Sequence, residues 1–120
     1  MTGITRFHTS ARASKIVIHN GVIHLSGQVA EDPDADIEEQ TRSTLSRVDA
    51  LLAEAGSDSA HILSASIYLR NIASDFASMN TVWNEWVPNG HAPARACVEA
   101  HMAQSALLVE ICVTAVVIVE

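Results

Sequence analysis

The fold is decided by LLVEICVTAVVIV, residues 107–119. Apolar residues occupy both odd and even positions of this stretch, whereas a strand with one face in water alternates apolar and polar residues. Both faces of this strand therefore need cover. Helices of the same chain can cover one face, and the short chain has no second layer for the other. We expect another copy of the chain to cover it, in a closed cyclic assembly.

The rest of the sheet is expected from four shorter stretches. KIVIH (15–19) and VIHLS (22–26) are β-branched runs joined by Asn20-Gly21, which suits a two-residue type I′ turn and predicts a hairpin. Further strands are predicted at 61–69 and 95–101.

Two helices are expected between these strands. The first begins near Ile37, after a capping Asp34 or Asp36, and ends at Gly56. Its buried face is predicted from apolar and small residues three and four apart: Ile37, Thr41, Leu45, Val48 and Leu52. The second runs over 74–87 with one stripe of Phe76, Asn80, Trp83 and Val87, in which Trp83, like Trp86, serves as a core or interface anchor. Together these elements predict one α+β domain over residues 1–120, a two-layer sandwich with both helices on one face of a mixed sheet.

Composition limits the partners. The chain has 120 residues and a formal net charge of −7, which disfavours nucleic acid and anionic membranes. No apolar run reaches the roughly 18 residues of a membrane helix, and the first residues do not resemble a signal peptide, so we expect a cytoplasmic protein. Cys97 and Cys112 lack CxxC spacing and are interpreted as buried, reduced thiols. Six histidines include no HxxxH pair, so no metal is expected.

Glu110 is the most informative polar residue, because it stands in the middle of the apolar stretch. Burying an unpaired carboxylate costs several kcal/mol. It is either one half of an ion pair at a subunit boundary or a group that activates water or shuttles a proton.

Arg95 opens a strand of small and apolar residues. Its planar fork suits bidentate binding of a carboxylate. The alternative is an intersubunit salt bridge to Glu99 or Glu110.

Two weaker candidates complete the predicted site. Asn80 lies on the stripe of the second helix and either bonds the neighbouring backbone or contacts a ligand. Ser26-Gly27-Gln28 ends a strand and is either a plain turn or an anion-binding segment.

Six segments, in order and spacing, resemble the RidA/YjgF family: SGQ (26–28), DIEEQT (36–41), LLAEAGS (51–57), DFASMN (75–80), HAPARACV (91–98) and VEI (109–111). The resemblance covers about residues 5–118. IVIHNGVI, DADIEEQT and NEWVPNGHAPAR resemble its YoaB-like subgroup in particular.

This resemblance implies a chorismate-mutase-like fold and a homotrimer whose sheets form a central barrel, with clefts between subunits that bind small carboxylates. Deaminating members hydrolyse 2-enamine and 2-imino acids to 2-keto acids and ammonia, without a cofactor. By the same resemblance, Arg95 is the carboxylate-binding arginine, Cys97 the pocket cysteine and Glu110 the water-orienting glutamate. The matching substrate-binding positions are Asn80, Ser26 and Gly27.

The chain departs from the deaminating pattern at two positions. Ala13 stands where many such members carry a tyrosine, and Cys112 where a second glutamate is common. The resemblance as a whole still predicts an imine deaminase. The alternative is a non-catalytic trimer that binds or senses a small carboxylate. An endoribonuclease conflicts with the acidic composition.

Overall fold

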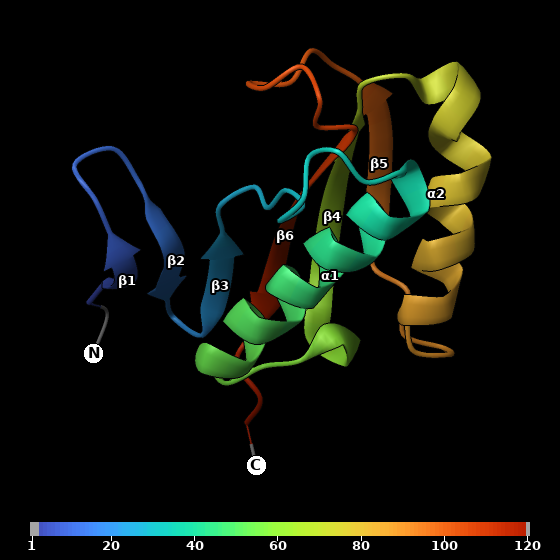
Figure 1. Cartoon of the computed structure of the whole chain (residues 1–120). Helices are drawn as coiled ribbons and strands as arrows, with labels where there is room; N and C mark the ends of the chain where they lie inside the picture. The colour runs from blue at the N-terminus through green and yellow to red at the C-terminus, as the bar shows by residue number, and fades with distance from the viewer. Residues whose placement is uncertain (1–2, 120) are drawn as a thin grey trace.

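The computed structural model describes residues 3–119, which form one six-stranded sheet and two long helices on one of its faces (Figure 1). The strands are β1 (Thr5–Thr9), β2 (Ser14–His19), β3 (Val22–Leu25), β4 (Ile62–Leu69), β5 (Ala94–Glu99) and β6 (Val109–Val116). The helices are α1 (Ile37–Glu54) and α2 (Ile72–Trp86), and a short 3₁₀ turn, η1 (Ser59–His61), precedes β4. The predicted α+β sandwich with a mixed sheet is confirmed.

The sheet has the order β1-β2-β3-β6-β4-β5, and only the β4–β5 pair is parallel. The predicted hairpin is β2–β3, and its two turn residues have the positive φ values that a type I′ turn requires, 52° at Asn20 and 77° at Gly21. Strand β1 was not predicted. It adds an outer edge, and the β1–β2 pair extends beyond the helical layer (Figure 1).

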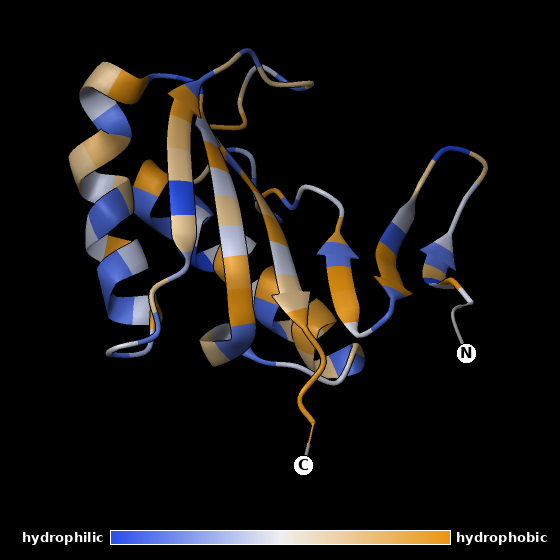
Figure 2. Ribbon diagram, turned by 180° about the vertical axis from the view of Figure 1, so that it is seen from behind, coloured by the Kyte–Doolittle hydropathy of each residue, from blue (hydrophilic) through white to orange (hydrophobic). Residues whose placement is uncertain are grey.

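Burial along β6 alternates, although its apolar residues do not. Val109, Ile111, Val113 and Ala115 are buried beneath the helices, whereas the residues between them are only half-buried. The helices therefore bury one face of this strand, as expected, and the cover expected for the other face from a second copy stays a prediction. The second face is open, and Figure 2 shows the strands from this uncovered side with the helices behind.

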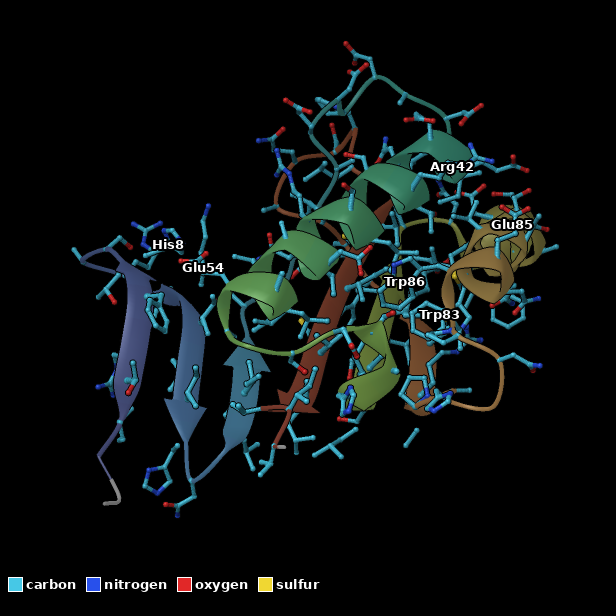
Figure 3. All side chains as sticks on the ribbon, turned by 90° about the horizontal axis from the view of Figure 1, so that it is seen from below. His8, Arg42, Glu54, Trp83, Glu85 and Trp86 are labelled. Carbon is cyan, nitrogen blue, oxygen red and sulfur yellow. The ribbon has the colours of Figure 1, made fainter. Side chains whose placement is uncertain are left out.

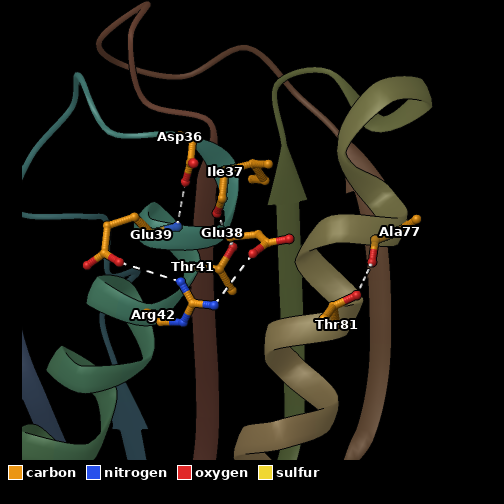
Figure 4. A network of polar contacts seen from close by, with 8 residues as sticks. All are labelled: Asp36, Ile37, Glu38, Glu39, Thr41, Arg42, Ala77 and Thr81. Carbon is orange, nitrogen blue, oxygen red and sulfur yellow. Dashed lines mark hydrogen bonds and ion pairs between the residues drawn. The ribbon is translucent and has the colours of Figure 1, made fainter.

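Helix α1 begins and ends as predicted. The Asp36 carboxylate accepts a hydrogen bond from the Glu39 backbone N–H at 2.9 Å, which caps the first turn (Figure 4). Gly56, with a φ of 85°, follows the last turn. The expected apolar face is buried at Thr41, Leu45, Val48 and Leu52 and half-buried at Ile37.

Helix α2 begins two residues earlier than predicted, and its buried stripe is a different one. Met79, Val82 and Trp83 face the interior, whereas the Phe76 residue is 42% exposed. Of the predicted stripe, Trp83 is buried and Val87 packs half-buried against the core. The observed stripe of residues 79, 82, 83 and 86 is also spaced three and four apart, so the spacing alone did not distinguish the two. Neither α1 nor α2, the long helices of residues 3–119, combines the length and hydropathy needed to cross a bilayer.

The strand ends also differ from the predictions. His61 lies in η1, Ser26 follows the end of β3, and His101 lies in the loop after β5. That loop is held by Gln40, a fully buried residue of α1. Its amide donates to the backbone oxygen of Ala106 at 3.1 Å and accepts from the Leu108 N–H at 2.8 Å. Gln40 therefore positions the approach to β6, where Glu110 lies.

Candidate functional site

Arg95 lies on β5, on the side of the sheet that α2 covers. Its Nη1 atom donates to Oδ1 of Asn80 at 2.7 Å, and its guanidinium carbon lies 5.3 Å from the ring centroid of Trp83. The amide fixes one edge of the guanidinium and the indole supports its face, an arrangement that a cation–π contact stabilises. We call Arg95, Asn80, Trp83 and Cys97 the arginine cluster.

The guanidinium of Arg95 is oriented but keeps donors for a ligand. The residue is exposed, and within residues 3–119 it forms no ion pair. Glu99, one expected salt-bridge partner, instead accepts a hydrogen bond from the Ile72 N–H at the start of α2, at 3.0 Å. Asn80 bonds Arg95 rather than the neighbouring backbone. The remaining N–H groups of Arg95 match the two oxygens of a carboxylate.

Cys97 is two residues from Arg95 along β5 and lies on the same side of the sheet. It is half-buried, not buried as expected. Burial raises the pKa of its thiol, and the positive charge of Arg95 offsets part of that rise. The neutral thiol therefore predominates at pH 7, which suits packing or hydrogen bonding rather than nucleophilic attack.

Glu110 lies on the open face of the sheet, directly opposite Tyr68 of β4. It lines a hollow of about 300 Å³, which we call the glutamate hollow; its other lining residues are Tyr68, Ala100, His101, Met102 and Cys112. Cys112, too, is half-buried. Burial raises the pKa of its thiol, and the charge of Glu110 raises it further.

The Ser26-Gly27-Gln28 segment runs alongside β6 and reaches the glutamate hollow. Gln28 and Ile111 exchange two backbone hydrogen bonds, at 2.9 and 3.0 Å. A side-chain carbon added at Gly27 would collide with Oε2 of Glu110 and would lie 3.0 Å from Sγ of Cys112. Only glycine leaves room for the carboxylate where it now lies. The Ser26 hydroxyl donates to the backbone oxygen of Ser14 at 2.5 Å, and Ser26 and Gly27 also line a second hollow that includes Ala13.

The predicted site residues therefore form two groups on opposite faces of one sheet. On β4, Ala65 is the register partner of Arg95 and Tyr68 the partner of Glu110. These partners are three residues apart, and strand side chains alternate between faces, so Arg95 and Glu110 point in opposite directions. The structure brings together Arg95, Asn80 and Cys97, and separately Gly27 and Glu110 with Ser26 beside them. It does not bring the two groups together within one chain.

A family model described as Endoribonuclease L-PSP matches residues 3–117. The chain is 44% identical over 114 residues to the RutC family protein YoaB of Escherichia coli, covering 95% of this chain and 98% of that one. It is 41% identical over 114 residues to a RutC family protein of Haemophilus ducreyi, covering 95% and 97%. A crystal structure of a YjgF family member from Neisseria meningitidis superposes with a TM-score of 0.95 at 48% identity, covering 99% and 98%. The chain belongs to the RidA/YjgF family.

Several side chains around the two groups were not singled out from the sequence of this RidA/YjgF protein. Tyr68 is the only tyrosine of the chain, and its even position in β4 places it beside Glu110. His101 and Met102 reach the same hollow from an irregular loop, which no periodic pattern marks. Among the described residues, no three His, Cys, Asp or Glu side chains are grouped as metal ligands would be.

Proposed function

We propose that this protein hydrolyses 2-imino acids to 2-keto acids and ammonium, as a cytoplasmic homotrimer with its pockets between subunits. The observation that carries the proposal is the environment of the Arg95 guanidinium. Its guanidinium is fixed by Asn80 and Trp83, yet within residues 3–119 no carboxylate neutralises it. A fixed guanidinium with free donors is built to bind the carboxylate of a ligand.

The opposite directions of Arg95 and Glu110 support a pocket shared between two copies. One chain cannot place both groups on one small molecule, because the sheet lies between them. A second copy packed on the open face can bring its own arginine cluster to the glutamate hollow of its neighbour. A closed ring of three copies gives each cluster such a neighbour and covers the open face of β6.

The reaction needs no cofactor, because an iminium carbon is already electrophilic. Arg95 holds the carboxylate, and Glu110 of the partner subunit takes a proton from water as the oxygen attacks C2. Glu110 then returns that proton to the nitrogen of the resulting carbinolamine. The C2–N bond breaks, the hydroxyl of the intermediate becomes the keto group, and its proton leaves with ammonia as ammonium.

A specific observation favours a second candidate, a trimer that binds a small carboxylate without turnover. Ala13, which stands where many deaminating members of the resembled family carry a tyrosine, lines the hollow beside Ser26 and Gly27. A methyl group supplies no hydroxyl to orient a substrate or water. Hydrolysis of RNA is the weaker proposal, because the formal net charge of −7 repels a phosphate backbone.

A competition assay distinguishes hydrolysis from binding. An amino-acid oxidase generates the 2-imino acid in place, and semicarbazide traps whatever imine survives. We expect catalytic amounts of the protein to lower semicarbazone formation in proportion to its concentration and to release the keto acid faster. Semicarbazone formation unchanged by the protein, with 2-oxobutanoate still bound in calorimetry, would replace the enzyme with the carboxylate-binding trimer.

A further inference from the structure

The space beside the Glu110 carboxylate lies on one side of β6, which runs between β3 and β4 in the sheet. On the β3 side the carboxylate lies against Gly27, where a single added side-chain carbon would collide with it. On the β4 side the directly opposite residue is Tyr68, and Tyr68 and Glu110 both line the glutamate hollow of about 300 Å³. Paired residues of neighbouring strands point to the same face. A small molecule that reaches Glu110 from the open face therefore extends toward Tyr68.

The walls of the glutamate hollow are mostly apolar. Tyr68 contributes an aromatic ring, Met102 a thioether and Ala100 a methyl group. Burial, and then the charge of Glu110, raises the pKa of the Cys112 thiol, so this wall is uncharged near neutral pH. Among the described residues no Lys or Arg lines the hollow. Nothing in its walls therefore balances an anionic side chain of a substrate.

The reacting carbon C2 of a 2-imino acid carries a carboxylate, a nitrogen and a side chain. The charge of Glu110 repels the carboxylate, which Arg95 of the neighbouring copy binds in the proposed pocket. Trp83, which supports the guanidinium of Arg95, lies on the helix-covered side of the sheet (Figure 3), so the copy that holds the carboxylate is not the one that provides the hollow.

The nitrogen and the side chain remain to be placed. The nitrogen leaves as ammonium and needs a path to water. Of the six residues that line the glutamate hollow only His101 is exposed, which puts that path at its edge. The side chain is then the group that faces the apolar walls.

We infer that the glutamate hollow binds the side chain of the substrate and that Tyr68 selects a large apolar one. This inference rests on the proposed imine hydrolysis and names its substrate class, 2-imino acids with an aromatic side chain. Two aromatic rings in offset or edge-to-face contact gain more than their buried area alone provides. The sulfur of Met102 adds a favourable contact with a ring. A methyl side chain would leave most of the hollow to water.

Two substrates that differ by one phenyl ring test the inference. Oxidation of alanine gives 2-iminopropanoate, and oxidation of phenylalanine gives 2-imino-3-phenylpropanoate. We expect kcat/KM for the phenyl substrate to be on the order of 10-fold higher, because even one methylene in an apolar pocket changes specificity by about 10-fold or more. The ratio of the two values is compared between variants, so the intrinsic reactivity of each imine cancels.

Substitutions in the walls locate the effect. Tyr68→Ala removes the ring and should lower the phenyl preference several-fold, whereas Tyr68→Phe keeps the ring and should keep the preference. Met102→Gln makes a loop-borne wall polar at nearly the same length, so it should lower the preference even if Tyr68→Ala disturbs folding or assembly. Leu63→Ala is the matched control, because Leu63 is an apolar residue of the same strand, 49% exposed and outside the hollow. It should leave the preference unchanged.

The outcomes separate this inference from the proposed function. Equal kcat/KM for the two imines, or a preference for 2-iminopropanoate, overturns the side-chain site and leaves imine hydrolysis standing. A phenyl preference that both Tyr68→Ala and Met102→Gln leave unchanged also overturns it. If neither imine is turned over, the hydrolysis fails, and calorimetry of the two keto acids decides the site. Tighter binding of phenylpyruvate than of pyruvate, lost in Tyr68→Ala and kept in Tyr68→Phe, keeps the side-chain site; equal binding removes it.

Discussion

Gly27 and Glu110 approach so closely that the backbone of one residue and the carboxylate of the other share the space a methyl group would need. Gln28 and Ile111, the residues that follow Gly27 and Glu110, exchange two backbone hydrogen bonds, which fix the spacing between the two chain segments. The position of the carboxylate therefore depends on a residue that is distant in sequence and carries no functional group.

Gly27→Ala should displace the Glu110 carboxylate without unfolding the chain. The added methyl group meets the far end of a flexible side chain, which can rotate away at small cost. We expect turnover of a 2-imino acid to fall by on the order of 10-fold, since misplacement of a catalytic group by about 1 Å can cost up to about 100-fold. Gly3→Ala, where nothing lies within 4 Å of the added carbon, is the matched control. Normal turnover by Gly27→Ala would contradict a role for the precise position of Glu110.

Arg95→Ala should impair ligand binding, whereas Glu110→Gln should impair turnover. Loss of a charge-assisted hydrogen bond costs roughly 1.5 to 3 kcal/mol, so Arg95→Ala should weaken the binding of 2-oxobutanoate by on the order of 10- to 100-fold. Glu110→Gln keeps the shape but removes the base, so binding should persist while kcat falls. Calorimetry and the trapping assay measure the two effects separately. Normal binding by both variants, with no turnover by the wild type, would indicate that both residues form a structural ion pair between subunits.

Asn80 should act through Arg95 and not on the substrate. Asn80→Ala removes the acceptor that holds Nη1 of Arg95 at 2.7 Å and leaves the guanidinium resting on Trp83. We expect KM to rise several-fold while kcat changes little, because the loss is one of orientation in binding. Asn80→Asp keeps an acceptor at this position but adds a carboxylate that competes with the ligand for Arg95, so it should weaken binding rather than restore it. A fall in kcat at unchanged KM would instead place Asn80 at the reacting atoms.

The pH dependence of thiol alkylation reports the charge of Glu110. Burial, followed by the charge of Glu110, raises the pKa of Cys112, so less of its reactive thiolate is present near neutral pH than in a free cysteine. Glu110→Gln removes the second cause. The alkylation profile of Cys112 should then shift to lower pH. Cys97, whose pKa is raised by burial and lowered by Arg95, is the internal control in the same peptide digest. An unshifted Cys112 profile would contradict an electrostatic effect of Glu110 on this thiol.

The sequence predicts the elements that depend on local chemistry. Asn20-Gly21 predicts its hairpin because positive φ at two successive residues suits few sequences. Asp34 or Asp36 predicts the start of α1 because a carboxylate there can bond a free N–H of the first turn, and the structure shows that Asp36 does so. Strand β1 has no comparable signal. Its sequence, TRFHT, is polar, and it is a strand only because β2 offers it an edge.

The site was predicted residue by residue but not in its arrangement. Arg95 and Glu110 were each identified as charges in apolar strands, and their placement on opposite faces follows from a register that the sequence does not state. Trp83, expected as a core or interface anchor, also supports the guanidinium of Arg95. The predicted stripe would have turned Phe76 toward the core. In the structure α2 is rotated so that Met79 is buried instead, and Trp83 lies against the guanidinium.

The two faces of β6 allow folding and assembly to be tested separately. Val113 is buried beneath the helices, so Val113→Asp places an unpaired charge in the core and should unfold the chain, at a cost of several kcal/mol.

Thr114 is the next residue, half-buried on the open face opposite His24 and Ser64. In a single chain its side chain reaches water, so Thr114→Asp should fold with nearly native circular dichroism. In the proposed trimer three copies of that carboxylate would be brought under cover together, and sedimentation should show a folded monomer. Because the pocket needs two copies, the monomer should also lose imine hydrolysis while keeping the hydrogen bond between Arg95 and Asn80. A Thr114→Asp protein that sediments as a trimer, or a wild type that is monomeric at micromolar concentration, would contradict assembly through this face.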